Sequence, residues 1–165
     1  MLKIWQIKPN PEGKDRYDGV SDAPVHQVSS EWIDLKYDAL VGHYIMGGVK
    51  LQKQIEKDGQ VIWWDVLEFP ADIHFELGAE KVLRIHSGKL MAEAAMERQD
   101  REGADFHFFT QKSFVWSNKN AENIRILDKD GKVLDEAAYD PWPPEGEILH
   151  RNDKNKLIYV FKEQG

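Results

Sequence analysis

The sequence predicts an all-β chain folded as two packed antiparallel sheets, and the clearest observation is a hairpin pattern in its C-terminal half. Residues 124–127 (Ile-Arg-Ile-Leu) alternate with the period of a half-buried strand. Residues 128–131 (Asp-Lys-Asp-Gly) supply turn chemistry, and Val133 begins a strand that runs back. Trp116 precedes this hairpin and is large enough to fill the space between two sheets. We therefore expect a hairpin accompanied by a core anchor.

A second hairpin pattern and the composition support the same fold. Residues 50–56 and 61–67 are strand-like and flank Lys-Asp-Gly-Gln at 57–60, a favourable turn sequence. The chain has 165 residues, of which 41% are hydrophobic and 31% charged, as in an ordinary globular protein. A chain of this length buries roughly 70% of its unfolded surface. It contains no cysteine, which excludes disulfides and thiolate zinc sites. We expect a single domain over residues 1–165.

The N-terminal part predicts two further strands and a long loop. Residues 2–7 alternate, and Pro-Asn-Pro-Glu-Gly at 9–13 ends this strand because proline cannot donate to a sheet ladder. Residues 14–30 are polar and predict a long loop. Residues 31–35 (Glu-Trp-Ile-Asp-Leu) alternate again, and the position of Trp32 in this strand predicts a core residue.

One helix and a C-terminal extension complete the predicted elements. Gly103 marks the end of a short amphipathic helix near residues 89–102, which we expect to cover one open end of the sandwich, with an ion pair between Glu97 and Arg101. Its apolar positions at helical spacing are Leu90, Met91, Ala94 and Ala95. The proline-rich residues 140–146 predict a stiff extended connector, and residues 157–161 predict a last strand.

Several short elements occur in a characteristic order. They are Asn-Pro-x-Gly-x-Asp at 10–15, Glu-Trp-Ile-Asp-Leu at 31–35, the turn residues Asp38, Leu40 and Gly42, Phe69-Pro70, Leu77-Gly78, the strand pattern at 82–88 and the hairpin segment 116–139. In this order they resemble a lamin tail domain, especially the bacterial ones, over about residues 2–140, with 141–165 as an extension. The resemblance implies an immunoglobulin-like β-sandwich and a role in docking other proteins.

One departure from the lamin tail pattern lies before the final hairpin. The family usually has Gly ahead of the acid at this place, whereas this chain has Asn120-Ala121-Glu122. Asparagine tolerates left-handed dihedrals, so the turn survives the change.

The charge balance and the lack of targeting patterns limit the partners. Asp and Glu outnumber Lys and Arg by 29 to 22, a net charge of −7. Such a surface repels phosphate backbones, so nucleic-acid binding is the weakest function considered. No apolar run is long enough to span a membrane, and the N-terminus lacks the apolar core of a signal peptide. These patterns predict a cytoplasmic protein, or a secreted one if a leader has been removed.

Loop carboxylates offer an alternative function. Asp15, Asp18, Asp22 and Glu31 lie in or beside the long loop, where their oxygens could gather around a calcium ion. The chain would then be a calcium-binding module or a metal-dependent hydrolase. Their spacing matches no loop template, and solvated loop acids are the simpler interpretation. The acids within residues 128–131 resemble the start of an EF-hand but lack its later ligands, which favours a hairpin turn.

The sequence contains no recognisable catalytic set. The histidines are His26, His43, His74, His86, His107 and His150. None lies three or four residues from another, so no helical or turn-based zinc pair is present. His86 and His107 could meet across strands, although ordinary half-buried histidines are the simpler interpretation. No Gly-x-Ser-x-Gly elbow, P-loop or dinucleotide fingerprint occurs. We expect no enzymatic activity, no metal site and no cofactor.

Tryptophans are the candidate partner-binding residues. Trp63 and Trp64 are adjacent, so in a strand they face opposite sides, which leaves one of them available to a partner. Trp142 lies among prolines and either binds a partner or plugs the end of the sandwich, and we favour the plug. The expected function is protein docking, with weak self-association through an edge strand as a further expectation.

Overall fold

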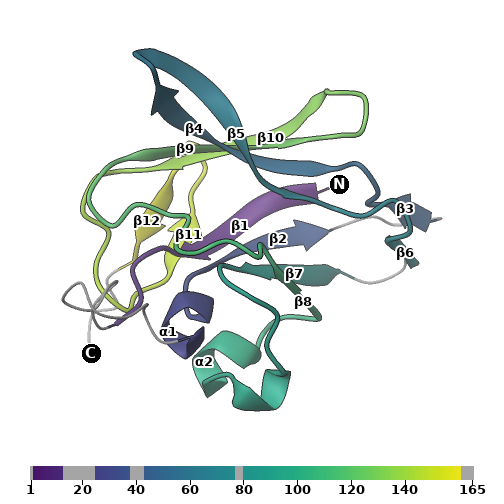
Figure 1. The fold of residues 1–165 in the computed structure, drawn as a ribbon, viewed down its shortest axis with the longest axis horizontal. Helices are drawn as coiled ribbons and strands as arrows, with labels where there is room; N and C mark the ends of the chain where they lie inside the picture. Colours follow the sequence, from purple (N-terminus) through teal and green to yellow (C-terminus); the bar gives the residue numbers. More distant parts are fainter. Residues whose placement is uncertain (1, 13–24, 38–42, 77–79, 161–165) are drawn as a thin grey trace.

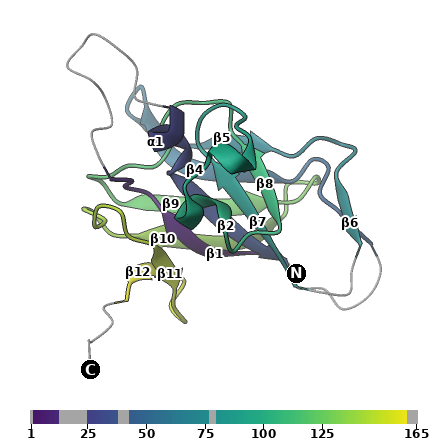
Figure 2. The same cartoon turned by 90° about the horizontal axis from the view of Figure 1, so that it is seen from below.

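The chain folds into two facing sheets, which Figures 1 and 2 show from two directions. The computed structural model describes residues 2–12, 25–37, 43–76 and 80–160. The strands within these residues are β1 (Leu2–Lys8), β2 (Trp32–Tyr37), β3 (His43–Ile45), β4 (Lys50–Lys57), β5 (Gln60–Glu68), β6 (His74–Glu76), β7 (Lys81–His86), β8 (Phe106–Phe109), β9 (Glu122–Leu127), β10 (Val133–Tyr139), β11 (Leu149–Arg151) and β12 (Leu157–Tyr159). The predicted all-β sandwich is confirmed.

The larger sheet has six strands in the order β12-β11-β1-β2-β7-β8. Strands β1, β2 and β7 pair antiparallel, as predicted. β8 is an exception, because it runs parallel to β7. A parallel pair needs a long crossover, and residues 87–105 supply it. A separate strand pair, β3 with β6, lies beside the two sheets (Figure 1).

The smaller sheet has four strands in the order β10-β9-β4-β5. It consists of the two predicted hairpins, β4–β5 and β9–β10, joined through an antiparallel pairing of β4 with β9. At the first turn both Asp58 (φ 53°) and Gly59 (φ 75°) have left-handed backbones. This is the conformation of a two-residue type I′ turn, which an Asp-Gly pair favours.

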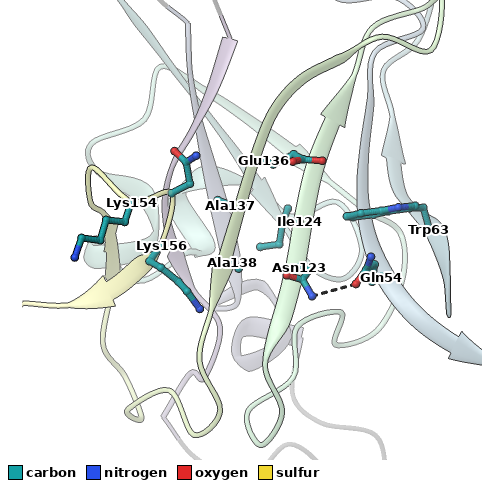
Figure 3. Close-up of a pocket in the computed structure, with 10 residues that line it drawn as sticks. Gln54, Trp63, Asn123, Ile124, Glu136, Ala137, Ala138, Lys154 and Lys156 are labelled. Atoms are coloured by element: carbon teal, nitrogen blue, oxygen red, sulfur yellow. Dashed lines mark hydrogen bonds between the residues drawn. The ribbon is translucent and has the colours of Figure 1, made fainter.

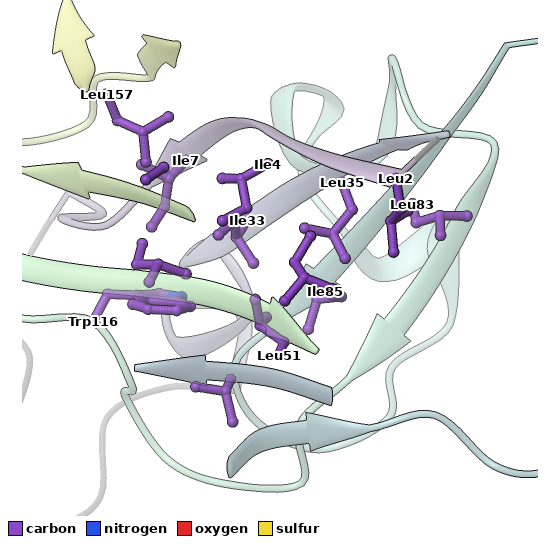
Figure 4. Close-up of a cluster of buried hydrophobic side chains, with 14 of the residues drawn as sticks. Leu2, Ile4, Ile7, Ile33, Leu35, Leu51, Leu83, Ile85, Trp116 and Leu157 are labelled. Atoms are coloured by element: carbon purple, nitrogen blue, oxygen red, sulfur yellow. The ribbon is translucent and has the colours of Figure 1, made fainter. Parts of the chain in front are cut away.

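The core lies between the two sheets (Figure 4). In that view side chains of β1, β2 and β7 point toward Leu51 of β4 and toward Trp116. Trp116 is only 5% exposed and belongs to this core, as predicted. Trp32 is also fully buried, but it is absent from the main core cluster because its position alternates with the inward-facing Ile33. It packs instead on the outer face of the larger sheet, against Arg84.

The segment expected to be one amphipathic helix is broken into two turns. A 3₁₀ turn spans Glu93–Ala95, and helix α2 spans only Arg98–Arg101. The chain between them is extended at Met96 (φ −80°, ψ 149°), which interrupts the helix. The expected apolar face is also wrong, because Leu90 is 76% exposed while Met96 and Asp100 are buried.

The position of α2 differs from the expected cover over an open end. Asp100 accepts hydrogen bonds from Lys8 of β1 and Trp32 of β2, so the turn lies on the outer face of the larger sheet. The ion pair of this segment joins Arg98 to Glu102 rather than Glu97 to Arg101.

A second short helix, α1 (Val25–Ser29), lies in the stretch expected to be loop. Among the described residues, no helix has the length and apolar character needed to cross a membrane.

Candidate functional site

The β4–β5 hairpin extends beyond the sheet that it belongs to (Figure 1). β4 pairs with β9 only over residues 50–53, whereas it pairs with β5 over residues 50–57. Within the described residues, the outer part of the hairpin is therefore a two-stranded ribbon without a third strand beside it. Ile55 and Ile62 face each other across this ribbon, both half-buried, and Val61 is 67% exposed. Two strands alone are only marginally stable in water, which makes this ribbon a natural place for added contacts.

The outer side of β5 is an edge of the smaller sheet. Proteins commonly protect such edges with lysine, proline or a covering loop. Lys112 covers one point, since its ammonium donates to the carbonyl of Val66 at 2.9 Å. Residues 60–65 (Gln-Val-Ile-Trp-Trp-Asp) contain neither lysine nor proline. Within this part of the edge the protecting features are confined to its C-terminal end, where Asp65 carries a charge and the register with β4 shifts.

Trp63 and Trp64 lie on opposite faces of β5, as adjacent strand residues must. Trp64 packs against the hydrophobic core, and the Lys112 ammonium lies 5.1 Å from its ring centre. Trp63 lies on the outer face, where the Arg125 guanidinium is 4.1 Å from its ring centre. The structure therefore separates the two candidates: Trp64 contributes to the core and Trp63 to the surface.

Trp63 also forms one wall of a groove on the outer face of the smaller sheet (Figure 3). The groove has a volume of about 470 Å³. It crosses from Gln54 and Trp63 over Asn123 and Ala138 to the turn between β11 and β12. Sequence reasoning did not find this groove, because it depends on strands β5, β9 and β10 being neighbours of a C-terminal turn.

Trp142 is not a plug over the sandwich end, in contrast to our expectation. Its side chain is 72% exposed, and its backbone has a left-handed φ of 62°. The neighbouring Pro143 is buried instead, with its carbonyl held by the Asn10 side chain at 2.9 Å. Packing of the proline turns the tryptophan outward. Trp142 lies outside the residues that line the groove.

Of the proposed calcium ligands, Glu31 alone lies in the described part of the chain. Asp15, Asp18 and Asp22 lie outside the described residues. Glu31 is 1% exposed, and one of its carboxylate oxygens accepts three hydrogen bonds from the protein. The donors are the hydroxyl of Ser87 and the backbone N–H groups of Val115 and Trp116. Glu31 therefore ties β2 to the segment before β9. Within the described residues, no group of three or more His, Asp or Glu side chains is arranged to hold a metal ion.

A buried polar cluster between α2 and the larger sheet was not predicted from sequence. Asp100 of α2 accepts hydrogen bonds from the Lys8 ammonium (2.8 Å), the Trp32 indole (2.9 Å) and the Ser30 hydroxyl (2.6 Å). Arg84 of β7 donates to both carboxylate oxygens of Asp34, each at 2.8 Å. These contacts neutralise charges that would otherwise be costly to bury.

The guanidinium of Arg84 also reaches back to α2. It donates to the backbone carbonyls of Glu102 (2.7 Å) and Asp100 (3.2 Å), which are acceptors that a helix leaves free at its C-terminal end. Burial raises the pKa of Asp34, and its bonds to Arg84 oppose that shift. The cluster thus fixes the α2 turn to the sheet through charged side chains instead of apolar ones.

His86 and His107 meet within the same cluster, across the β7–β8 pair. Nδ1 of His86 lies 2.6 Å from the carbonyl oxygen of Ser29, and Nε2 lies 2.8 Å from Nδ1 of His107. A carbonyl can only accept, so Nδ1 of His86 carries the hydrogen and Nε2 accepts from His107. Burial lowers the pKa of His86 to about 4 and also lowers the pKa of His107. Both rings are therefore neutral near pH 7.

Most charged groups of this cluster are shielded from solvent. Asp34, Arg84, His86 and Asp100 are each 2% exposed or less. A hollow of about 440 Å³ lies beside it, lined in part by Lys8 and Ser30. The polar atoms of those two side chains are bonded to Asp100, so they do not offer free groups to a substrate. His107 differs from these four residues, because its ring is only half-buried.

Comparison with models of known protein families finds no match for this chain. A search of curated proteins finds no relative either.

Proposed function

We propose that the chain is a non-enzymatic docking module of lamin-tail type, which binds an extended segment of a partner protein along the edge of β5. The observation that carries this proposal is the edge at residues 60–65, protected at its C-terminal end alone, on a hairpin that extends beyond its sheet. Strand addition to such an edge is a recurring mode of peptide recognition, in which backbone hydrogen bonds supply affinity. The lamin tail resemblance supports a docking role by analogy alone.

The chemistry of β5 favours a particular partner. A strand added beside β5 would place alternate side chains next to Trp63 on the outer face and next to Ile62 and Trp64 on the inner face. β5 carries Asp65 and Glu68 but no lysine or arginine, and the whole chain has a net charge of −7. The net charge therefore favours a segment that carries Lys or Arg, with apolar residues at the positions beside Trp63 and Trp64, where Arg125 and Lys112 already supply cations. The same net charge disfavours pairing with a second copy of this chain.

A peptide-display selection followed by binding assays tests this proposal. Random peptides selected on the protein should be enriched in apolar and basic residues, and their binding should slow hydrogen exchange of backbone amides within residues 60–65. Val61→Lys adds a positive charge to the edge at an exposed position, and it should weaken binding of the selected peptides at least about tenfold. The matched control is Val133→Lys, on β10 at the opposite edge of this sheet, where Val133 is 40% exposed.

Three outcomes contradict the proposal. They are a selection that yields no binding peptide, protection of amides outside β5, and two lysine variants that both bind like the parent. If chromatography instead gives a dimer that Val61→Lys dissociates, the edge binds a second copy and the proposed heterologous partner is wrong.

A further inference from the structure

The groove on the outer face of the smaller sheet has its own chemistry, separate from the β5 edge (Figure 3). Its volume of about 470 Å³ falls within the range of small-molecule sites, roughly 300–1,000 Å³. The hollow exists because Ala138 faces outward and leaves room between the tall side chains of Trp63 and Lys156. The docking proposal shares Trp63 with this hollow but uses none of its other lining residues.

An aromatic surface forms one wall of the groove. The guanidinium of Arg125 covers part of the Trp63 ring, but Arg125 does not line the groove. The part of the ring that borders the groove is therefore available to a ligand. The indole N–H of Trp63 has no acceptor among the described residues, so the ring offers an apolar surface together with a free donor.

Two amide side chains stand beside the tryptophan and hold each other in place. The side-chain NH₂ of Asn123 donates to the amide oxygen of Gln54 at 3.0 Å. This leaves the Gln54 NH₂ group as a donor and the Asn123 oxygen as an acceptor without partners in the described part of the chain. A fixed donor and a fixed acceptor side by side suit a ligand group that both accepts and donates.

The charges that line the groove nearly cancel. Glu136 and Lys154 have no side-chain partner among the described residues and do not form an ion pair with each other. The ammonium of Lys156 is already paired with Asp140 at 2.8 Å. An anionic ligand would meet the Glu136 carboxylate, and a cationic one would meet the Lys154 ammonium. The groove therefore fits a neutral ligand better than a charged one.

We propose that this groove binds a neutral carbohydrate, with a sugar ring packed against Trp63 and its hydroxyl groups bonded to Gln54, Asn123 and Glu136. Sugar hydroxyls both donate and accept, which matches the mixed set of free groups. The C–H face of the ring matches the apolar indole surface. Ala138 provides the space in which the ring lies.

A titration followed by ¹H–¹⁵N NMR tests the proposal. The probes are cellobiose, xylobiose, chitobiose and maltose as neutral sugars, glucuronic acid as an acidic sugar, and short polylysine and polyglutamate peptides as charged controls. At least one neutral sugar should give saturable shifts at Asn123, Ala138 and the Trp63 indole N–H. Trp63→Ala should weaken that binding at least about tenfold, since a buried aromatic anchor commonly dominates affinity.

Two further variants test whether sugar binding depends on residues that line the groove. Ala138→Trp fills the hollow and should abolish sugar binding. Glu136→Ala is a smaller change that should retain the fold and weaken sugar binding. It keeps the test decisive if Ala138→Trp perturbs the sheet. Val61→Ala is the matched control, because Val61 shares β5 with Trp63 but does not line the groove. It should bind sugar like the parent.

The proposal is overturned if no neutral sugar gives saturable shifts at the groove, or if only a charged probe does. It is equally overturned if sugar binds Glu136→Ala and Trp63→Ala as tightly as the parent. These results are independent of the docking proposal: Val61→Lys should disturb peptide binding alone, and Ala138→Trp should disturb sugar binding alone.

Discussion

Acidification should weaken the fold through His86, whose buried ring contacts Ser29 of α1 and stacks with His107 and Phe109 of β8. In the native state Nε2 of His86 accepts a hydrogen bond from His107, and Nδ1 donates to Ser29. Adding a proton to Nε2 would make two N–H groups face each other and would place a charge in a buried site. The pKa of His86 is accordingly lowered by burial from 6.5 to about 4.

The size and the sign of the effect follow from proton linkage. Between pH 6.5 and about 4 the imidazole is protonated in the unfolded chain but neutral in the folded protein. The unfolded state binds more protons in this window, so stability decreases as the pH falls through it. Each pH unit corresponds to about 1.4 kcal/mol, which gives a loss of about 3 kcal/mol from His86 by the lower end of the window.

Urea unfolding at a series of pH values measures this loss, and NMR titration of the His86 ring gives its pKa directly. His86→Gln cannot be protonated and should show a shallower decrease in stability over the same pH range. A His86 ring that titrates near 6.5, or a variant whose stability falls with pH as steeply as the parent's, would refute this reasoning.

Other predictions address the core, one buried hydrogen bond and the charge of the surface. Trp116→Ala should reduce the free energy of unfolding by about 3–5 kcal/mol, as usual for a buried large aromatic, and a loss below about 1 kcal/mol would contradict its place in the core. Tyr139→Phe removes the hydroxyl that donates to the carbonyl of Ser117 at 2.7 Å, and urea unfolding should report a loss of about 1 kcal/mol; an unchanged stability would mean that this bond contributes nothing. Duplex DNA should not bind with sub-micromolar affinity at physiological salt, because the net charge is −7; tight binding with a steep salt dependence in a fluorescence assay would reveal a basic face.

The hairpins and much of the core could be predicted because their signals are local. Strand alternation and turn residues within a short window place the β4–β5 and β9–β10 hairpins almost to the residue. The inward positions of Ile124 and Ile126 follow from the same alternation. The core position of Trp116 follows from size and from its place before a strand.

The polar cluster could not be predicted because it depends on strand register and on a crossover. Asp34 and Arg84 are opposite each other only once β2 and β7 are paired, and they are 50 residues apart. His86 meets His107 only because β8 runs parallel to β7. The prediction of the buried face of the 89–102 segment was wrong for a related reason. Besides Met96, the buried residue of this segment is Asp100, a residue type that helical periodicity assigns to solvent.

Predicting the orientation of the tryptophans requires both the local strand alternation and the order of strands in the sheets. Alternation alone required Trp63 and Trp64 to face opposite sides, but only the sheet order shows that the core lies on the side of Trp64. The exposure of Trp142 depends on the burial of the neighbouring Pro143, which no sequence pattern indicated.

The position of a bound peptide relative to β5 is the measurement that tests docking along this edge most directly. Nuclear Overhauser effects between a selected, isotope-labelled peptide and the protein report which backbone atoms lie side by side. The account predicts a ladder of backbone contacts from the peptide to residues 61–65, with its side chains alternating between Trp63 and Trp64. A peptide bound without backbone contacts to β5, or bound at another strand, would contradict the account.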